Sequence, residues 1–333
     1  MRLTLSFRTI AIGVVAGLAS ALLMLSPAGG SALAVPLTAA VGLPLVIVSL
    51  GWGTAAGIVA VVVASAATAF GHPLLALDFA VFFAPPAVVG SHLIGLARPR
   101  PAAPVVDPGM PAPPKSDLEW YPLGRMAAIV ALIAAAAAVG IAFFADFNPA
   151  ALSAEQINDL TAIYAQMMSE GGPAPTADDL AAIRQGLPVM LALLPLIFTA
   201  VWTLIALINL YLGAWIAARS DKLARPWEDV AGFEPPLWAT LAFFAAVAFS
   251  TFGGTFGALA LALAGGFAML HLLVGLGVAH TVTRGWALRV PLLITIYVLF
   301  GLFALPLLVI GLIERFARLR AWARGRALAP PSR

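Results

Sequence analysis

The sequence contains no cysteine, and only 10% of its 333 residues are charged. The absence of cysteine excludes disulfides, thiolate catalysis and cysteine-based metal sites. A soluble domain carries about 25% charged residues. Because this chain is 62% hydrophobic, it cannot cover a surface that faces water. The composition therefore excludes a soluble enzyme, a disordered chain and a secreted disulfide scaffold.

The few charges are confined to short stretches. Six segments lack Asp, Glu, Lys and Arg altogether: residues 9–77, 79–97, 126–145, 185–218, 235–283 and 290–313. A helix that spans a bilayer needs roughly 20 mainly apolar residues, so each segment holds at least one span and the longer ones hold several. The sequence predicts an all-α protein: a polytopic bundle of about eight or nine transmembrane helices, with a small helical insert outside the membrane.

Residues 1–97 form a block of four predicted spans. Glycine and proline turn signals separate them into segments near 9–26, 33–50, 53–70 and 74–97. Arg2 and Arg8 precede the block, and Arg98 and Arg100 follow it. The positive-inside rule places both ends in the cytoplasm, which requires an even number of crossings. Four spans with a cytoplasmic N-terminus satisfy this requirement.

The first segment has an alternative interpretation as a cleaved signal peptide. The apolar run 9–25 follows two arginines, and the small residues at 31–34 imitate a cleavage site. We expect a retained span, because another uncharged segment follows at once.

The middle of the chain changes character three times. Seven prolines between Pro99 and Pro114 predict an extended cytoplasmic linker over 98–123. Residues 124–217 then predict a helix pair that carries an acidic extracytoplasmic insert at 146–186. Within the insert, Ser153 and Gln156 form a capping box, and Thr176 can begin a second helix. The insert is either an amphipathic hairpin lying on the bundle, or a lid or cation trap.

The C-terminal part divides into a mixed-charge cytoplasmic loop at 218–236, a membrane block at 237–314 and a basic tail at 315–333. Three crossings would place the tail outside, against the positive-inside rule. Two crossings keep it inside and require one re-entrant or surface-bound segment. We expect a cytoplasmic tail, with non-helical backbone at 250–255. A basic tail alone does not indicate nucleic-acid binding, and we expect none.

Few side chains in the spans can carry chemistry. Among Asp, Glu, Lys and Arg residues, only Asp78 lies inside an apolar segment. Its carboxyl is either functional, or it is a protonated or paired group near the membrane surface. Trp202 and Asn209 share a helix face, where Asn209 is either a packing contact or part of a ligand cavity. His92 and His271 are ligand candidates or helix–helix hydrogen-bond donors. The candidate ligand-binding residues are therefore Asp78, His92, Trp202, Asn209 and His271.

Catalytic motifs are absent from the sequence. It lacks the G-x-x-x-x-G-K-[ST] loop of ATPases and the G-x-S-x-G and H-E-x-x-H motifs of hydrolases. No histidine pair has the i,i+4 spacing of a metal site. We therefore expect no enzyme, no catalytic residue, no metal site and no cofactor.

Small residues recur at a spacing of four, which lets helices approach closely. The expected helix-packing residues are Gly13, Gly17, Ala21, Gly53, Gly57, Gly253 and Gly257.

Several short motifs in a fixed order resemble the YybS-like family of uncharacterised bacterial membrane proteins, in its alphaproteobacterial form. They are Leu43-Pro44-Leu45 with Leu50-Gly51-Trp52-Gly53, Pro85-Pro86 before Leu96-Ala97-Arg98, Glu119-Trp120-Tyr121-Pro122-Leu123-Gly124, Asn209-Leu210-Tyr211-Leu212 before Ala217-Ala218-Arg219, and Gly311-Leu312-Ile313-Glu314-Arg315-Phe316 before Arg318 and Arg320. The hydropathy layout is similar to that of S components of energy-coupling-factor transporters. Those proteins dock on a shared transmembrane subunit through small residues of the first helix.

This resemblance implies a multi-pass protein of the bacterial inner membrane that binds and translocates a small metabolite. The implied partners, beside the lipid bilayer, are an energy-coupling transmembrane subunit and ATPases. Gly13, Gly17 and Ala21 would dock that subunit, although Gly-x-x-x-Gly-x-x-x-Ala here replaces an Ala-x-x-x-Ala pattern. The alternative function is a non-transporting scaffold for envelope assembly or cell division.

Overall fold

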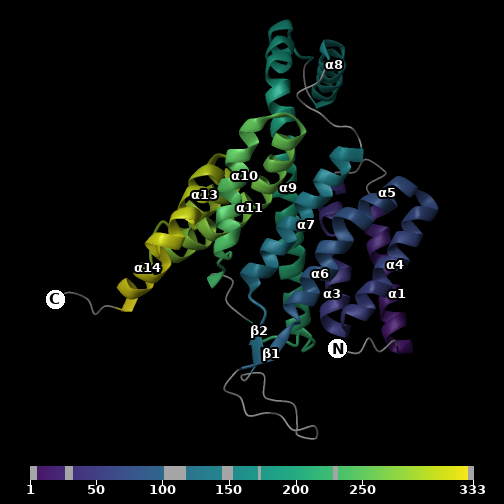
Figure 1. Cartoon of the computed structure of the whole chain (residues 1–333), viewed down its shortest axis with the longest axis vertical. Helices are drawn as coiled ribbons and strands as arrows, with labels where there is room; N and C mark the ends of the chain where they lie inside the picture. Colours follow the sequence, from purple (N-terminus) through teal and green to yellow (C-terminus); the bar gives the residue numbers. More distant parts are fainter. Residues whose placement is uncertain are drawn as a thin grey trace, which may run out of the picture.

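The computed structural model describes residues 6–26, 33–100, 118–144, 153–171, 174–227 and 232–328, and these are almost entirely helical (Figure 1). Eight helices or broken helices in this part of the chain are long and apolar enough to cross a membrane. The expected all-α polytopic bundle is confirmed.

The four expected spans of the N-terminal block are present, and two of them are broken. The elements are α1 (Phe7–Leu25), α2 (Ala34–Ala39), α3 (Leu43–Trp52), α4 (Thr54–Gly71), α5 (Pro73–Asp78), the π-helix η2 (Phe79–Phe83) and α6 (Ala84–Ile94). The second span is α2 with α3, and the fourth is α5, η2 and α6. Gly53, at φ +93°, makes the tight turn from α3 to α4.

The glycines of α1 pack against another helix of the same protein. Added Cβ atoms at Gly13 and Gly17 would meet the backbone carbonyl oxygens of Ala56 and Ala60 on α4. Ala21 is also buried. Gly13 and Gly17 therefore face α4 and Ala21 is buried, so these residues do not present the free docking surface that the resemblance implied.

A short antiparallel ribbon and two helices follow. Strands β1 (Ala97–Pro99) and β2 (Leu118–Trp120) pair with each other, and α7 (Leu123–Phe144) begins beyond them. The sequence predicted only an extended linker here; most of that linker, residues 101–117, lies outside the described residues.

Helices α8 (Ala154–Gly171) and α9 (Ala177–Arg219) form a hairpin that rises above the bundle (Figure 1). The predicted capping box of Ser153 and Gln156 is present, and Thr176 caps α9. The sequence predicted an insert that ends at residue 186, whereas α9, which is 43 residues long, continues through that point. At 1.5 Å per residue it is about 64 Å long, roughly twice the thickness of the hydrocarbon core.

The C-terminal elements are α10 (Leu237–Phe249), the 3-10 turn η6 (Ser250–Phe252), α11 (Gly254–Val282), α12 (Arg289–Val298), α13 (Phe300–Ala317) and α14 (Leu319–Leu328). The expected break is present, with Gly253 and Gly254 at φ +68° and +58°. Helices α10 and α12 are each shorter than a full span.

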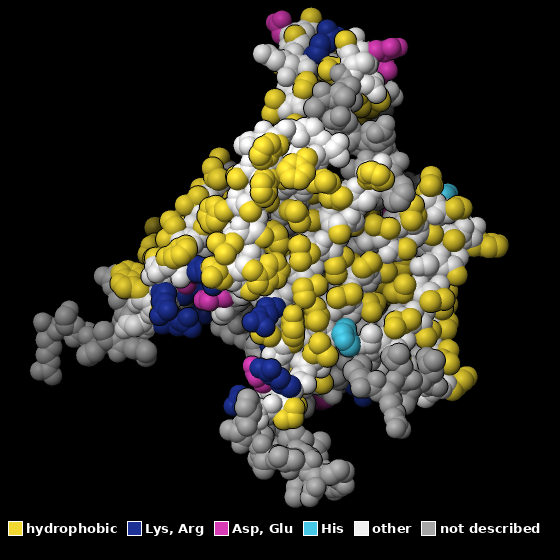
Figure 2. All heavy atoms as spheres, viewed as in Figure 1, with side chains coloured by type: hydrophobic (Ala, Val, Ile, Leu, Met, Phe, Trp, Pro, Cys, Tyr) yellow, Lys and Arg dark blue, Asp and Glu magenta, His cyan; other side chains and the backbone are white. Residues whose placement is uncertain are grey.

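At one end of the molecule, hydrogen bonds join five chain segments to one another. Tyr121 N–H donates to the Leu96 carbonyl, and Arg225 donates to the Tyr121 carbonyl. Arg315 and Arg320 donate to the carbonyls of Pro235 and Phe233, beside the start of α7. Figure 2 shows Lys and Arg side chains concentrated at this end, below a band of hydrophobic side chains. We call this region the basic end.

Candidate functional site

Helix α9 presents two polar side chains to the N-terminal block. Trp202 and Asn209 are seven residues apart, which places them on one helix face about 10 Å apart along the axis. Close packing on both sides fixes this face: Leu210 fits against Gly90 of α6, and Val46 of α3 fits against Gly213. Each of the two polar side chains reaches a backbone carbonyl at a break in a neighbouring span.

Trp202 reaches the break in the fourth span. In a regular α-helix the Phe82 carbonyl would accept a hydrogen bond from the N–H group of residue 86, but Pro86 has none. The backbone widens into η2 just before this point. Trp202 Nε1 donates to the Phe82 carbonyl at 3.1 Å, so the indole supplies the bond that proline removes.

Asn209 reaches the break in the second span. At the junction of α2 and α3, Leu43 N–H donates to the Ala40 carbonyl instead of the Ala39 carbonyl. Asn209 Nδ2 donates to the Ala39 carbonyl at 2.6 Å and to the Ile205 carbonyl on its own helix at 2.8 Å. The amide therefore joins α9 to the unpaired carbonyl at this break.

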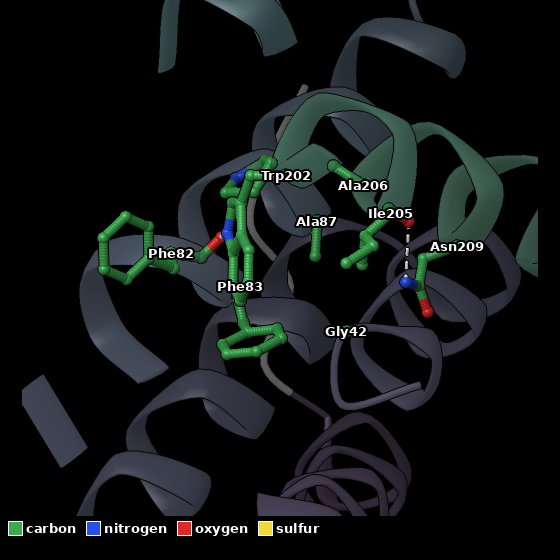
Figure 3. Close-up of a pocket in the computed structure, with 9 residues that line it drawn as sticks. Gly42, Phe82, Phe83, Ala87, Trp202, Ile205, Ala206 and Asn209 are labelled. Atoms are coloured by element: carbon green, nitrogen blue, oxygen red, sulfur yellow. Dashed lines mark hydrogen bonds between the residues drawn. The ribbon is translucent and has the colours of Figure 1, made fainter. Parts of the chain in front are cut away.

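A small cavity lies between the two capped breaks (Figure 3). Its volume is about 10 Å³, which is room for about one water molecule. The rings of Phe82 and Phe83 pack edge-on against the Trp202 indole, with centroids 5.2 Å and 5.0 Å away. The lining residues are Gly42, Phe82, Phe83, Pro86, Ala87, Trp202, Ile205, Ala206 and Asn209. Two broken spans and α9 thus line one mainly apolar cavity.

Asn209 supplies the polar group of this cavity that remains available. Its two amide hydrogens point to carbonyl oxygens, which fixes the orientation of the amide. Asn209 Oδ1 accepts no hydrogen bond from the described residues, and the residue is only 6% exposed. Trp202 Nε1 already donates its hydrogen bond to the Phe82 carbonyl. The cavity therefore offers an acceptor and no charged side chain.

The structure separates the other predicted ligand-binding residues from this cavity. Asp78 ends α5 and is partly buried. His92 lies at the end of α6, where its Nδ1 is 3.0 Å from Thr54 Oγ1. His271 is buried in α11 beside the Phe243 ring, and its Nε2 has no partner among the described residues. Of the five candidates, only Trp202 and Asn209 come together.

The four remaining glycines that were predicted to pack helices fall into two groups, two that pack closely and two that do not. An added Cβ at Gly57 would meet Ser49, and one at Gly257 would meet the Ser250 carbonyl, so these glycines pack closely. Gly53 and Gly253 have no atom within 4 Å of such a Cβ and adopt positive φ angles. They differ from the expectation because their role is to turn the chain, where L side chains are strained.

Sequence reasoning did not assign Phe82, Phe83, Pro86 or Gly42 to the site. The available signal was Pro85-Pro86 inside an apolar run, because two missing N–H groups in a span leave carbonyls that another element must satisfy. Pro44, just after Gly42, gave the same signal for the second span.

Sequence reasoning also missed a buried ion pair at the basic end. Arg320 Nε donates to Glu314 Oε1 at 2.8 Å, with the two side chains only 3% and 4% exposed. Arg320 also contacts Glu234 at 3.1 Å. An exposed pair lies nearby on the ribbon, where the hydrogen bond from Arg98 lowers the pKa of the Glu119 carboxyl.

Replacing Trp202 with phenylalanine tests the capped break directly. The variant keeps an aromatic ring but leaves the buried Phe82 carbonyl without its donor, which should cost about 1–3 kcal/mol of stability. Trp215→Phe on the same helix is the matched control, because Trp215 is 43% exposed. Thermal unfolding in detergent should show a clear loss for Trp202→Phe and little change for Trp215→Phe; equal shifts would contradict the assignment.

Comparison with known proteins gives the class of the chain but no specific activity. No curated protein and no solved structure matches it. The matching family carries only the description "Predicted membrane protein (DUF2232)", which names neither the YybS-like family nor the S components. That match extends over residues 17–313, most of the chain. The chain therefore belongs to this family of multi-pass membrane proteins.

Proposed function

We propose that the chain binds a small metabolite between its N-terminal block and α9 and takes part in moving it across the bacterial inner membrane. In this proposal it is not an enzyme; a separate ATPase pair and an energy-coupling transmembrane subunit supply the energy. The N-terminus and the basic end lie in the cytoplasm. The observation that carries the proposal is the pair of broken spans that α9 caps around one cavity.

Broken spans are a costly feature in a membrane protein. Unpaired backbone groups at membrane depth persist only where protein or water satisfies them. In transporters, discontinuous helices of this kind surround the substrate site. Here both breaks face the same helix, and Trp202 and Asn209 satisfy one carbonyl at each. This arrangement supports a binding site more than a simple structural joint.

The size of the cavity determines what binding requires. A volume of about 10 Å³ admits one water-sized group. A metabolite therefore binds only when α9 and the N-terminal block separate, and the ligand must favour that open arrangement by its own contacts. Because α4 covers the glycine row of α1, a coupling subunit must contact another face of the bundle.

Affinity purification of the tagged chain in gentle detergent, followed by mass spectrometry, tests this proposal. We expect an ATPase pair and a transmembrane coupling subunit to co-purify. A matched variant carries Ile163→Asp and Met167→Asp on α8, far from the basic end, and should retain these partners. Recovery of envelope or division proteins, with no ATPase module at any detergent strength, would contradict transport.

A scaffold for envelope assembly or cell division is the second candidate function. The observation that favours it is the hairpin of α8 and α9, which rises above the bundle (Figure 1). Ile163 and Met167 lie one turn apart on α8 and are 55% and 65% exposed. Apolar side chains exposed outside the membrane favour a protein partner. In this case the α8 variant, and not Trp202→Phe at the cavity, should lose the co-purified proteins.

A further inference from the structure

We infer that the solute bound at this cavity is neutral and donates a hydrogen bond, as an alcohol or an amide does, and that carboxylates and phosphates are excluded. This inference rests on the proposed function and names its substrate class. It follows from the fixed orientation of Asn209, the side chains that line the cavity, and the volume.

The hydrogen-bond acceptor of the cavity, Asn209 Oδ1, has a fixed orientation. Both hydrogens of the Asn209 amide are held by the carbonyls of Ala39 and Ile205. The amide therefore cannot rotate to offer a donor without leaving the partly buried Ala39 carbonyl unpaired. Figure 3 shows its oxygen directed away from the Ile205 carbonyl. A ligand group at this oxygen must donate a hydrogen bond.

The charge of the ligand follows from the lining. None of the nine lining residues is Lys, Arg, His, Asp or Glu. A carboxylate or phosphate would enter a largely apolar site without a counter-ion. It would also face the Asn209 Oδ1 atom, which is the negative end of the amide dipole and repels an anion. Burying an unpaired ion costs far more than burying a hydrogen-bonded neutral group. The site therefore selects against anions.

The shape of the ligand follows from the rings and the volume. The part that enters is the size of one water molecule, which suits a hydroxyl or an N–H group. The Phe82, Phe83 and Trp202 rings pack against one another here, and they provide apolar surface for the rest of the solute once α9 and the N-terminal block separate. A small neutral molecule with one polar end and an apolar body satisfies all three constraints.

The absence of cysteine from the chain permits a direct test. Ala206→Cys places a single thiol in the cavity lining. The probes are three methanethiosulfonates of similar length: 2-hydroxyethyl (neutral, donor), 2-methoxyethyl (neutral, no donor) and 2-sulfonatoethyl (anion). Mass spectrometry measures the rate of modification in membrane vesicles. Met167→Cys, exposed on α8, gives the intrinsic reactivity of each reagent, and Ile208→Cys, on an exposed face of α9, reports reaction in lipid.

We expect, relative to Met167→Cys, that the hydroxyethyl reagent modifies Cys at 206 about three- to tenfold faster than the methoxyethyl reagent, since one hydrogen bond distinguishes them. The sulfonatoethyl reagent should be slower by more than about tenfold. Adding Asn209→Leu should remove the advantage of the donor; Asn209→Ser is the milder substitution if that variant does not fold.

The outcomes separate the two proposals. Equal rates for the two neutral reagents, or modification by the anion at a comparable rate, overturn the inferred ligand class and leave the proposed binding site in place. If none of the reagents modifies Cys at 206 while Cys at 167 reacts, the cavity does not open to solutes, and both proposals fail.

Discussion

Replacing Gly311 with alanine should strongly destabilise the C-terminal block. A Cβ at this position would overlap the His271 carbonyl oxygen on α11, and one at Gly275 would overlap the Leu307 carbonyl oxygen on α13. These neighbours are backbone atoms of two helices, so the clash is relieved only by moving α13 away from α11. Overpacking by one methyl group costs typically about 1–3 kcal/mol, and we expect the upper part of that range or more.

Another glycine of α13 provides the control for Gly311→Ala. Gly301 lies in the same helix with no atom within 4 Å of an added Cβ. Gly301→Ala should be neutral or stabilising by up to about 1 kcal/mol, because alanine is the better helix former. Thermal unfolding of the two variants, followed by helical circular dichroism in detergent, makes the comparison. Similar midpoints for both variants would show that the helices are not held at the distance described.

Most of the membrane architecture was predictable from the sequence, because it depends on local composition. Uncharged runs of about 20 residues locate the spans, and the turns follow from glycine and proline. The break at Gly253 and Gly254 is an example, since glycine, which lacks a Cβ, adopts positive φ angles at the lowest steric cost. The capping box of α8 and the start of α9 at Thr176 were visible in the sequence for the same reason.

Features that depend on contacts between distant segments were not predictable in this way. The spacing of Trp202 and Asn209 indicated a shared face, but it did not show which carbonyls they meet, 120 and 170 residues away in the sequence. Likewise, the spacing of Gly13 and Gly17 indicated close packing but not that α4 is the partner. Small residues permit an approach from any helix, so the choice of partner depends on the whole fold.

Replacing Glu314 with glutamine should be the most damaging single change at the basic end. It leaves the Arg320 guanidinium, with a side chain 3% exposed, without its buried carboxylate. Removing one member of a buried pair typically costs about 3–5 kcal/mol, because the remaining charge stays desolvated. Arg320 also holds the Phe233 carbonyl, so the loss should loosen the contact between α14 and the start of α10. Thermal unfolding and proteolysis of the tail measure both effects.

Two comparisons make this prediction specific to burial. Glu119→Gln breaks an exposed ion pair of the same 2.8 Å length, and it should leave the unfolding midpoint unchanged. The double variant Glu314→Met with Arg320→Met removes both buried charges, and apolar replacement of a whole pair is often neutral or stabilising. It should therefore recover most of the stability that Glu314→Gln loses. If the double variant is as unstable as the single one, the two side chains do not act as a pair, and Arg320 instead stabilises the end of the chain through its bond to the Phe233 carbonyl.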